Sequence, residues 1–139
     1  MTVSTTQQLP GFERVPNELT LFSFGAATWN QHRIHYDRDY ARSEGHRDLI
    51  VEGNYQGALL AELAVSFAGT PTALKRLRYR HLRSAYVNET LHVAGCVAAV
   101  RKVPDDGVAE IELDLWITVD GERVTQGSAL VELPLEGVR

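Results

Sequence analysis

Three polar residues near the start of the chain have types and spacing suited to proton transfer. His35 follows Asn30 by five positions and precedes Asp37 by two, in a stretch without a regular apolar pattern. An imidazole has an unperturbed pKa close to neutral pH, so it can accept and return a proton there. The residue types suggest that His35 moves a proton, with Asn30 close to it in sequence. Two structural alternatives stay open: Asn30 forms a turn, and Asp37 caps a helix.

The residues that follow predict a helix whose start can hold a developing negative charge. Residues 49–54 lead into an alanine-rich apolar stretch, which predicts a helix over about 54–68. The first N–H groups of a helix have no partner within it, and such groups stabilise an oxyanion. Gly53 has no Cβ, so a carbonyl can approach its backbone; a tight turn with positive φ would also explain the glycine. A histidine facing this helix start suggests chemistry beside a carbonyl group.

Several charged side chains are further candidates, each with a structural alternative. Glu52 would interact favourably with the helix dipole, or it would supply an acid beside His35. Glu62 falls within the apolar helix, where burial requires a partner such as an arginine. Arg76 and Arg78 share one face of a predicted strand. They would bind phosphate groups of a substrate, or belong to a solvated face paired with carboxylates.

The other histidines are weaker candidates. His32 and His46 have little support as catalytic residues, and His81 and His92 lie in strand patterns, where packed or exposed bystanders are expected. His32 and His35 have no third ligand placed near them, so no metal site is expected.

Composition restricts the class of protein. The 139 residues suffice for one domain with a sizeable core, and 44% hydrophobic and 23% charged residues are ordinary for a globular protein. The net charge of −4 gives no reason to expect nucleic acid or an anionic membrane as a partner. The longest apolar run, residues 57–68, is too short to span a bilayer, and residues 1–10 contain no apolar signal segment, so the cytoplasm is the expected location. The single cysteine, Cys96, excludes an internal disulfide and is expected to be buried and inert.

Breaker residues and periodicity predict the elements before the main helix. Residues 1–16 are expected to be a loosely held lead-in, because prolines and a glycine interrupt regular structure, and residues 17–139 to form a single domain. A strand is predicted over residues 20–26 and a loop over 27–37. A short helix, capped by Asp37, should run through Arg42.

The main helix and the sheet follow. The helix has small or apolar side chains around nearly its whole circumference, which predicts burial on all sides and close approach of other elements. Gly69 and Pro71 should end it. The alternating patterns beyond it predict strands over residues 74–86, 90–103, 109–119 and 123–133.

The register of the last hairpin can be predicted, because a slip by one residue would turn apolar side chains to solvent. A simple two-residue loop at Asp120-Gly121 would place Leu113 opposite Ser128 and lose the apolar face. A bulge of one residue at Gly121 instead gives the pairs Ile111–Val131, Leu113–Ala129 and Leu115–Gly127. Small residues beside large ones leave a trough for a helix. One helix and a run of antiparallel strands predict an α+β domain, and the all-apolar helix predicts a dimer.

Over residues 20 to 133 the chain resembles the MaoC-like acyl dehydratase and hydratase family. The resemblance rests on the stretch 28–41, with Asn30 and His35, and on Ile50-Val51-Glu52-Gly53 before the helix. Residues 86–91 and 126–129 also look like the family's strand ends. It implies a hot-dog fold, an antiparallel sheet wrapped around one long central helix, usually dimerised into a larger sheet. The family's hydratase motif pairs an aspartate with a histidine five positions later, and here Asn30 occupies the aspartate position, as in one branch of the family.

The resemblance implies an enoyl thioester hydratase or dehydratase that acts on a coenzyme A or acyl carrier protein thioester without another cofactor. His35 and Asn30 would be catalytic. The expected substrate-binding residues are Gly53, Asn54 and Tyr55 through backbone N–H groups, with Glu52, Arg76 and Arg78. Two alternatives stay open: a half-catalytic or non-catalytic subunit of a heteromeric hydratase, and a thioesterase using Glu52 or Glu62. The expected partner is a second hot-dog chain, in a homodimer or a heterodimer.

Overall fold

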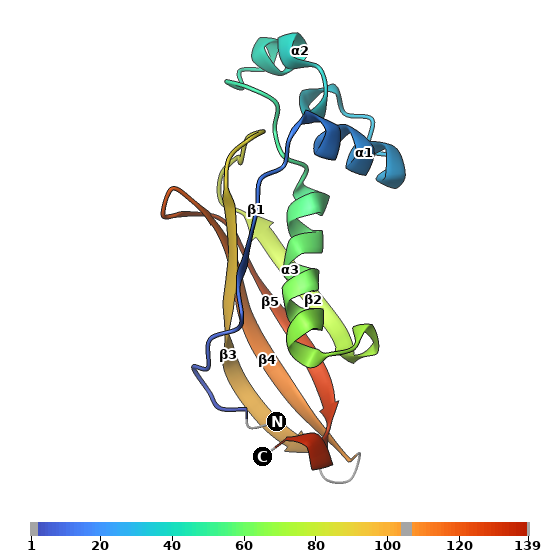
Figure 1. Cartoon of the computed structure of the whole chain (residues 1–139), viewed down its shortest axis with the longest axis vertical. Coiled ribbons are helices and arrows are strands. Elements are labelled where there is room, and N and C mark those ends of the chain that lie inside the picture. The colour runs from blue at the N-terminus through green and yellow to red at the C-terminus, as the bar shows by residue number, and fades with distance from the viewer. Residues whose placement is uncertain (1–2, 104–106, 139) are drawn as a thin grey trace.

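The computed structural model, which describes residues 3–103 and 107–138, contains an antiparallel sheet with a long helix across one face (Figure 1). The sheet has five strands in the order β1-β3-β4-β5-β2. The helices are α1 (Glu18–Thr28), α2 (Arg38–Ser43) and the long α3 (Gly53–Ala68), and the strands are β1 (Phe12–Arg14), β2 (Leu74–His81), β3 (Leu91–Val103), β4 (Val108–Val119) and β5 (Glu122–Pro134). Helices α1 and α2 lie near the start of α3. The predicted α+β fold, a sheet wrapped around one long helix, is confirmed.

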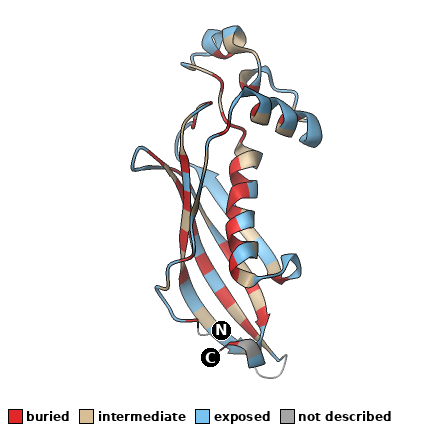
Figure 2. Cartoon of the chain, viewed as in Figure 1, coloured by how far each residue is buried: buried red, intermediate tan, exposed pale blue. Residues whose placement is uncertain are grey.

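Helix α3 starts one residue earlier than predicted and ends where Gly69 adopts a left-handed φ of 80°. Leu60 and Leu63 have no exposed surface. Within this single chain α3 is not buried on all sides, and burial of its remaining side against a second chain stays a prediction. Four residues at four-residue spacing stay exposed along one side of the helix (Figure 2), namely Asn54, Ala58, Glu62 and Ser66. Glu62 therefore has the expected arginine partner, Arg14 at 2.6 Å, but on the surface rather than in the core.

Small residues on α3 allow strand β2 to approach closely, as the sequence predicted. A Cβ on Gly57 would lie 2.4 Å from Tyr79 Cζ, and a Cβ on Gly53 would lie 2.6 Å from His81 Nε2. Four residues of helix rise about 6 Å and two residues of strand about 6.6 Å, so the two spacings match. The two glycines of α3 thus accommodate two alternate side chains of β2.

The hairpin of β4 and β5 has the predicted register, with Ile111, Leu113 and Leu115 opposite Val131, Ala129 and Gly127. The position of the bulge was wrong. Val119 pairs with Glu122 around a turn in which Asp120 and Gly121 both have positive φ, and the register shifts between Ile117 and Thr118. The extra residue is Val124, which is buried together with Thr125. Two consecutive inward side chains at this point bring Thr125 toward α3.

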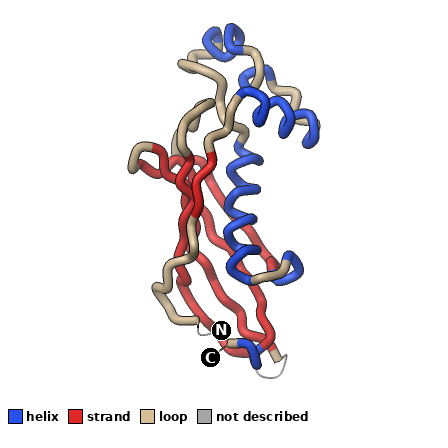
Figure 3. Tube along the Cα trace, in the orientation of Figure 1, coloured by secondary structure: helices blue, strands red, loops and turns tan. Residues whose placement is uncertain are grey.

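Four other predictions need correction, and Figure 3 shows those on secondary structure. Residues 20–26 belong to helix α1, because the Asn17 side chain accepts the Thr20 N–H at 2.9 Å and caps it. The lead-in is not loosely held: β1 pairs with β3, and Leu9 is buried. Strand β2 ends at His81 rather than at residue 86. Cys96 is free but only partly buried. Within the described residues, no helix combines the length and the apolar character needed to cross a membrane.

Candidate active site

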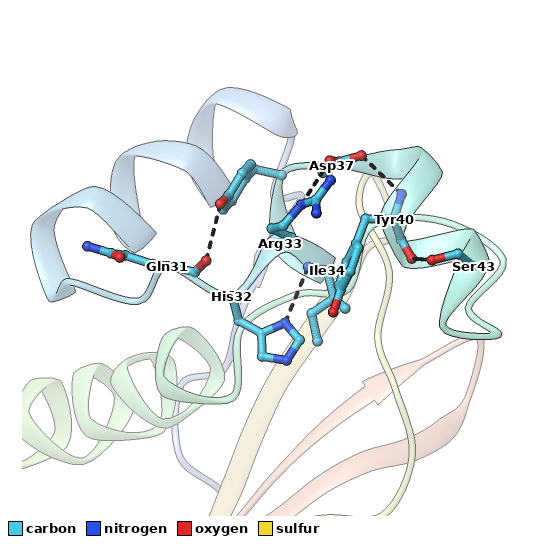
Figure 4. A network of polar contacts seen from close by, with 8 residues as sticks. Gln31, His32, Arg33, Ile34, Asp37, Tyr40 and Ser43 are labelled. Carbon is cyan, nitrogen blue, oxygen red and sulfur yellow. Dashed lines mark hydrogen bonds and ion pairs between the residues drawn. The ribbon is translucent and has the colours of Figure 1, made fainter.

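His35 is the last residue of a 3-10 turn, Arg33–His35, between α1 and α2. Local hydrogen bonds fix this turn, as Figure 4 shows. The His32 side chain accepts the Ile34 N–H, and Asp37 accepts both the Tyr40 N–H at 3.0 Å and the Arg33 guanidinium at 2.6 Å. Asp37 is thus the predicted cap of α2 and takes no part in the candidate site.

The His35 ring is held in one orientation and is only 8% exposed. Its Nδ1 lies 2.8 Å from the carbonyl oxygen of Ile50. A carbonyl oxygen only accepts, so Nδ1 carries the proton of the neutral ring and Nε2 keeps a lone pair. Burial lowers the pKa of His35 below its usual value, more than the hydrogen bond to Ile50 raises it. The ring is therefore neutral at pH 7 and able to accept a proton at Nε2.

His35 shares a cavity of about 200 Å³ with the start of α3, as the sequence predicted. Gly53, Gln56 and Val51 line it from the helix side. The N–H groups of the first helical turn have no partner within the helix, and no side chain of residues 3–103 or 107–138 caps them. Gly53 does not have positive φ, so the tight-turn explanation for this glycine was wrong. Its missing Cβ instead leaves room for the His81 ring.

His81, which the sequence suggested was a bystander, lines the same cavity, together with Arg83 and Ser84. Its Nδ1 lies 2.9 Å from Thr125 Oγ1, and the Thr125 hydroxyl donates to Gln56 Oε1 at 2.5 Å. Partial burial lowers the pKa of His81. One sequence signal could have indicated this residue. Gly53 and Gly57 are one helical turn apart, and this spacing matches that of alternate residues on a strand, such as Tyr79 and His81. The match can be recognised only when β2 is known to lie beside α3.

Asn30 and Glu52 line a different, mainly apolar cavity of about 500 Å³, with Leu21, Phe22 and Trp29 among its walls. Asn30 Oδ1 accepts the His32 N–H at 3.3 Å, which is the turn-forming alternative. The structure does not bring Asn30 into the His35 cavity. Glu52 is completely buried, and neither carboxylate oxygen has a hydrogen-bond partner among the residues that the structure describes. Burial raises the pKa of Glu52 to about 7.

The other predicted substrate-binding residues are scattered. The side chain of Asn54 is exposed, and Tyr55 packs edge-on against Phe24 with ring centroids 5.3 Å apart, so only their backbone N–H groups belong to the helix start. Arg76 pairs with Glu112 at 3.6 Å, which fits the alternative of a solvated strand face. Arg78 lines a separate surface hollow with Asp114. Neither arginine lines the His35 cavity.

The fold and this cavity define a class: a hot-dog domain with a neutral histidine beside the start of its central helix. The chain belongs to the hydroxyacyl-thioester dehydratase type 2 family, whose model matches residues 3–87, more than half of its length. The matched segment includes His35, Gly53 and His81. The resemblance to MaoC-like proteins is confirmed as well. A solved MaoC-like dehydratase from Rhodospirillum rubrum has a TM-score of 0.80 and 15% identity, covering 95% of this chain and 93% of that one.

Two curated proteins and one further solved structure are also similar to this chain. The chain is 35% identical over 77 residues to the mitochondrial hydroxyacyl-thioester dehydratase type 2 of Saccharomyces cerevisiae, covering 55% of this chain and 27% of that protein. It is 48% identical over 58 residues to the mesaconyl-C(4)-CoA hydratase of Chloroflexus aurantiacus, covering 41% and 21%. The matches thus span about a quarter of the relatives' length. The ChsH1–ChsH2 complex of Mycobacterium tuberculosis has a TM-score of 0.83 and 21% identity, covering 94% and 98%.

Proposed function

We propose that the protein catalyses reversible addition of water across the 2,3 double bond of an enoyl thioester of coenzyme A or acyl carrier protein. The observation that carries the proposal is the shared cavity of His35 and the start of α3. One side supplies a neutral imidazole with a free Nε2, and the other supplies unpartnered N–H groups. Both curated relatives are named for thioester hydration or dehydration, which supports the same class of reaction.

In this mechanism His35 Nε2 takes a proton from water while the oxygen attacks C3. The electron pair of the double bond moves through C2 toward the thioester oxygen, and the N–H of Gly53, with that of Asn54 or Tyr55, stabilises the enolate. His35 then returns the proton to C2. One oxyanion donor is typically worth about 3–4 kcal/mol in the transition state, and general acid–base catalysis a factor of about 100 to 10,000. The reaction requires no metal or redox cofactor, so activity should survive dialysis against a chelator.

The test is a panel of enoyl-CoA substrates of different chain length, followed by loss of the enoyl absorbance and by thiol release. Hydration lowers the absorbance without releasing thiol, whereas a thioesterase releases thiol. His35→Gln should reduce kcat by at least about 100-fold. His92→Gln is the matched control, because His92 is exposed on β3 and pairs with Glu13. Full activity of His35→Gln would refute the assignment, and thiol release would favour the thioesterase.

A heteromeric hydratase subunit is the second candidate. The observation that favours it is the site's separation into two cavities, with Asn30 outside the His35 cavity, together with exposed Phe22 and Trp29 on and just after α1. The ChsH1–ChsH2 complex, which contains a chain of similar fold, gives a precedent for pairing of unlike chains. Strand β2 forms a free sheet edge to which a hot-dog partner can add. A purified chain that is monodisperse yet inactive, and gains activity with a second hot-dog chain, would support this candidate over the homodimer.

The cytoplasmic location stays a prediction, and the yeast relative is named as mitochondrial. Fractionation of the source cells, with activity and antibody detection in each fraction, tests it.

A further inference from the structure

His81 is fixed in the cavity by contacts from three elements. On β5, Thr125 Oγ1 lies 2.9 Å from His81 Nδ1. On β2, Tyr79 packs against the ring at an angle, with ring centroids 5.6 Å apart. On α3, Gly53 provides the space that His81 Nε2 occupies, since a Cβ there would be 2.6 Å away. His81 is a solvent-exposed residue of β2, so these three contacts, rather than burial, fix the orientation of its ring.

The hydrogen bonds also determine which nitrogen of His81 carries the proton. Gln56 Oε1 can only accept, so the Thr125 hydroxyl donates its hydrogen to Gln56. The Thr125 oxygen must then accept from His81 Nδ1, which leaves Nε2 of the neutral ring with a lone pair. His35 has the same arrangement, because its Nδ1 donates to the Ile50 carbonyl. Two imidazoles with free Nε2 atoms therefore line one cavity of about 200 Å³.

We propose that His81 and His35 together bind the attacking water, so that His81 supplies the second acceptor which Asn30 does not. The proposal rests on the proposed hydratase function. A water molecule has two hydrogens, and donating one to each Nε2 leaves an oxygen lone pair free to attack C3. The O–H bond toward His35 breaks as the O–C3 bond forms, and the C2=C3 pair moves toward the thioester oxygen. The proton then passes from His35 to C2, while His81 keeps its hydrogen bond to the new hydroxyl.

Both rings must be neutral for this arrangement. The pH dependence of kcat/KM is therefore a readout that a purely structural role of His81 would not change. The charged or titratable groups around His81 are His35 from the 3-10 turn, Arg83 after β2, and Tyr79 on β2. Glu52 precedes Gly53, but its carboxyl points toward Gly25 in α1. Burial lowers the pKa of both imidazoles, so both lose their charge below neutral pH. At acid pH, the plot of log kcat/KM should approach a slope of two, and a slope of one when His81 is replaced.

The experiment compares the full-length wild type with His81→Gln, Thr125→Val and the control His92→Gln on the best enoyl-CoA substrate. His81→Gln should lower kcat by about 100-fold, leave KM within about threefold, and reduce the acid slope from two to one. Thr125→Val should lower kcat less, because Nε2 remains but the tautomer is no longer fixed. His92→Gln should change nothing. Unchanged kcat and an unchanged slope in His81→Gln would overturn the proposal.

Nitrogen-15 NMR of histidine provides a readout that needs no turnover. At pH 7, His35 and His81 should both be protonated at Nδ1 only, and both Nε2 signals should shift when butyryl-CoA, a saturated analogue, is added, whereas His92 should not respond. A wild type that hydrates no enoyl thioester refutes the proposed function and this proposal with it. An active wild type whose His81→Gln variant is equally active refutes His81 alone. If His81→Gln does not fold, Thr125→Val decides: full activity with an altered tautomer overturns the proposal, and reduced activity supports it.

Discussion

Replacing Glu52 by glutamine is expected to stabilise the protein at pH 8 and to have much less effect at pH 5. Glu52 is completely buried, and its two oxygens have no hydrogen-bond partner in the described part of the chain. A carboxylate removed from water without a partner strongly disfavours its charged form. Burial accordingly raises the pKa of Glu52 from 4.5 to about 7. Glutamine has nearly the same shape and carries no charge at any pH.

The magnitude follows from the shift of the pKa. A rise from 4.5 to about 7 is worth about 3 kcal/mol, at about 1.4 kcal/mol per unit. The sign is fixed by linkage. Between the unfolded and folded pKa values the folded state binds more protons, so its stability falls as the pH rises. The destabilisation is absent well below pH 4.5, under about 1 kcal/mol at pH 5, and complete above pH 7.

Urea unfolding of wild type and Glu52→Gln at pH 5, 6, 7 and 8, at one protein concentration, measures this difference. Other titrating groups contribute equally to both proteins and cancel. Glu62→Gln is the control, because Glu62 is exposed and paired with Arg14, and its replacement should give only a small loss of stability. A difference between wild type and Glu52→Gln that is the same at pH 5 and pH 8 would refute the reasoning, because the amide alone can add only a constant.

Three further predictions concern the helices, two on α3 and one on the cap of α2. Gly53→Ala should retain most of the thermal stability but lower kcat by at least about tenfold, because the new Cβ displaces the His81 ring at 2.6 Å; calorimetry and turnover measure the two effects. Gly57→Ala, its matched partner one helical turn later, should instead destabilise the protein by about 1 kcal/mol, because its Cβ overlaps the Tyr79 ring and forces this exposed ring to move. Asp37→Ala should lower the thermal midpoint at pH 7 by removing the cap of α2 and the pair with Arg33. Those contacts hold the pKa of Asp37 below its usual value, so the loss should shrink as the pH falls through that lowered pKa. An Asp37→Ala midpoint deficit that does not change with pH would contradict this account.

The strands were predictable where a wrong register would expose apolar side chains. In β4, five alternate residues from Ile111 to Val119 are buried, and any slip relative to β5 would turn one strand's apolar set outward. The position of the bulge was not predictable, because a bulge at Gly121 and one at Val124 give the same pairs farther along the strands. Only the burial of Val124 and Thr125 against the rest of the protein distinguishes them.

Helix α1 was missed although its signal was present. Leu19, Leu21 and the phenylalanines gave an alternating pattern typical of a strand. Asn17 competes with that pattern by capping the first turn, and only Leu21 and Gly25 of the helix are buried, one turn apart. A surface helix with so few buried positions has only a weak helical periodicity of apolar residues. The capping residue was therefore a better indicator of the helix than the apolar pattern.

In the candidate site, the residues placed by local sequence were predictable, and the residue placed by tertiary contacts was not. His35 and the start of α3 were predictable, because the backbone between them is short and ends in the Ile50 carbonyl that holds the ring. His81 was not, because its neighbours are 28 and 44 residues away in sequence, at Gly53 and Thr125. A loop residue at the motif's aspartate position suggested that Asn30 completes the site, yet its amide closes a turn. The strand beside the helix contributes a second imidazole to the cavity, and a side chain that reaches the cavity through a tertiary contact leaves no signal along the motif.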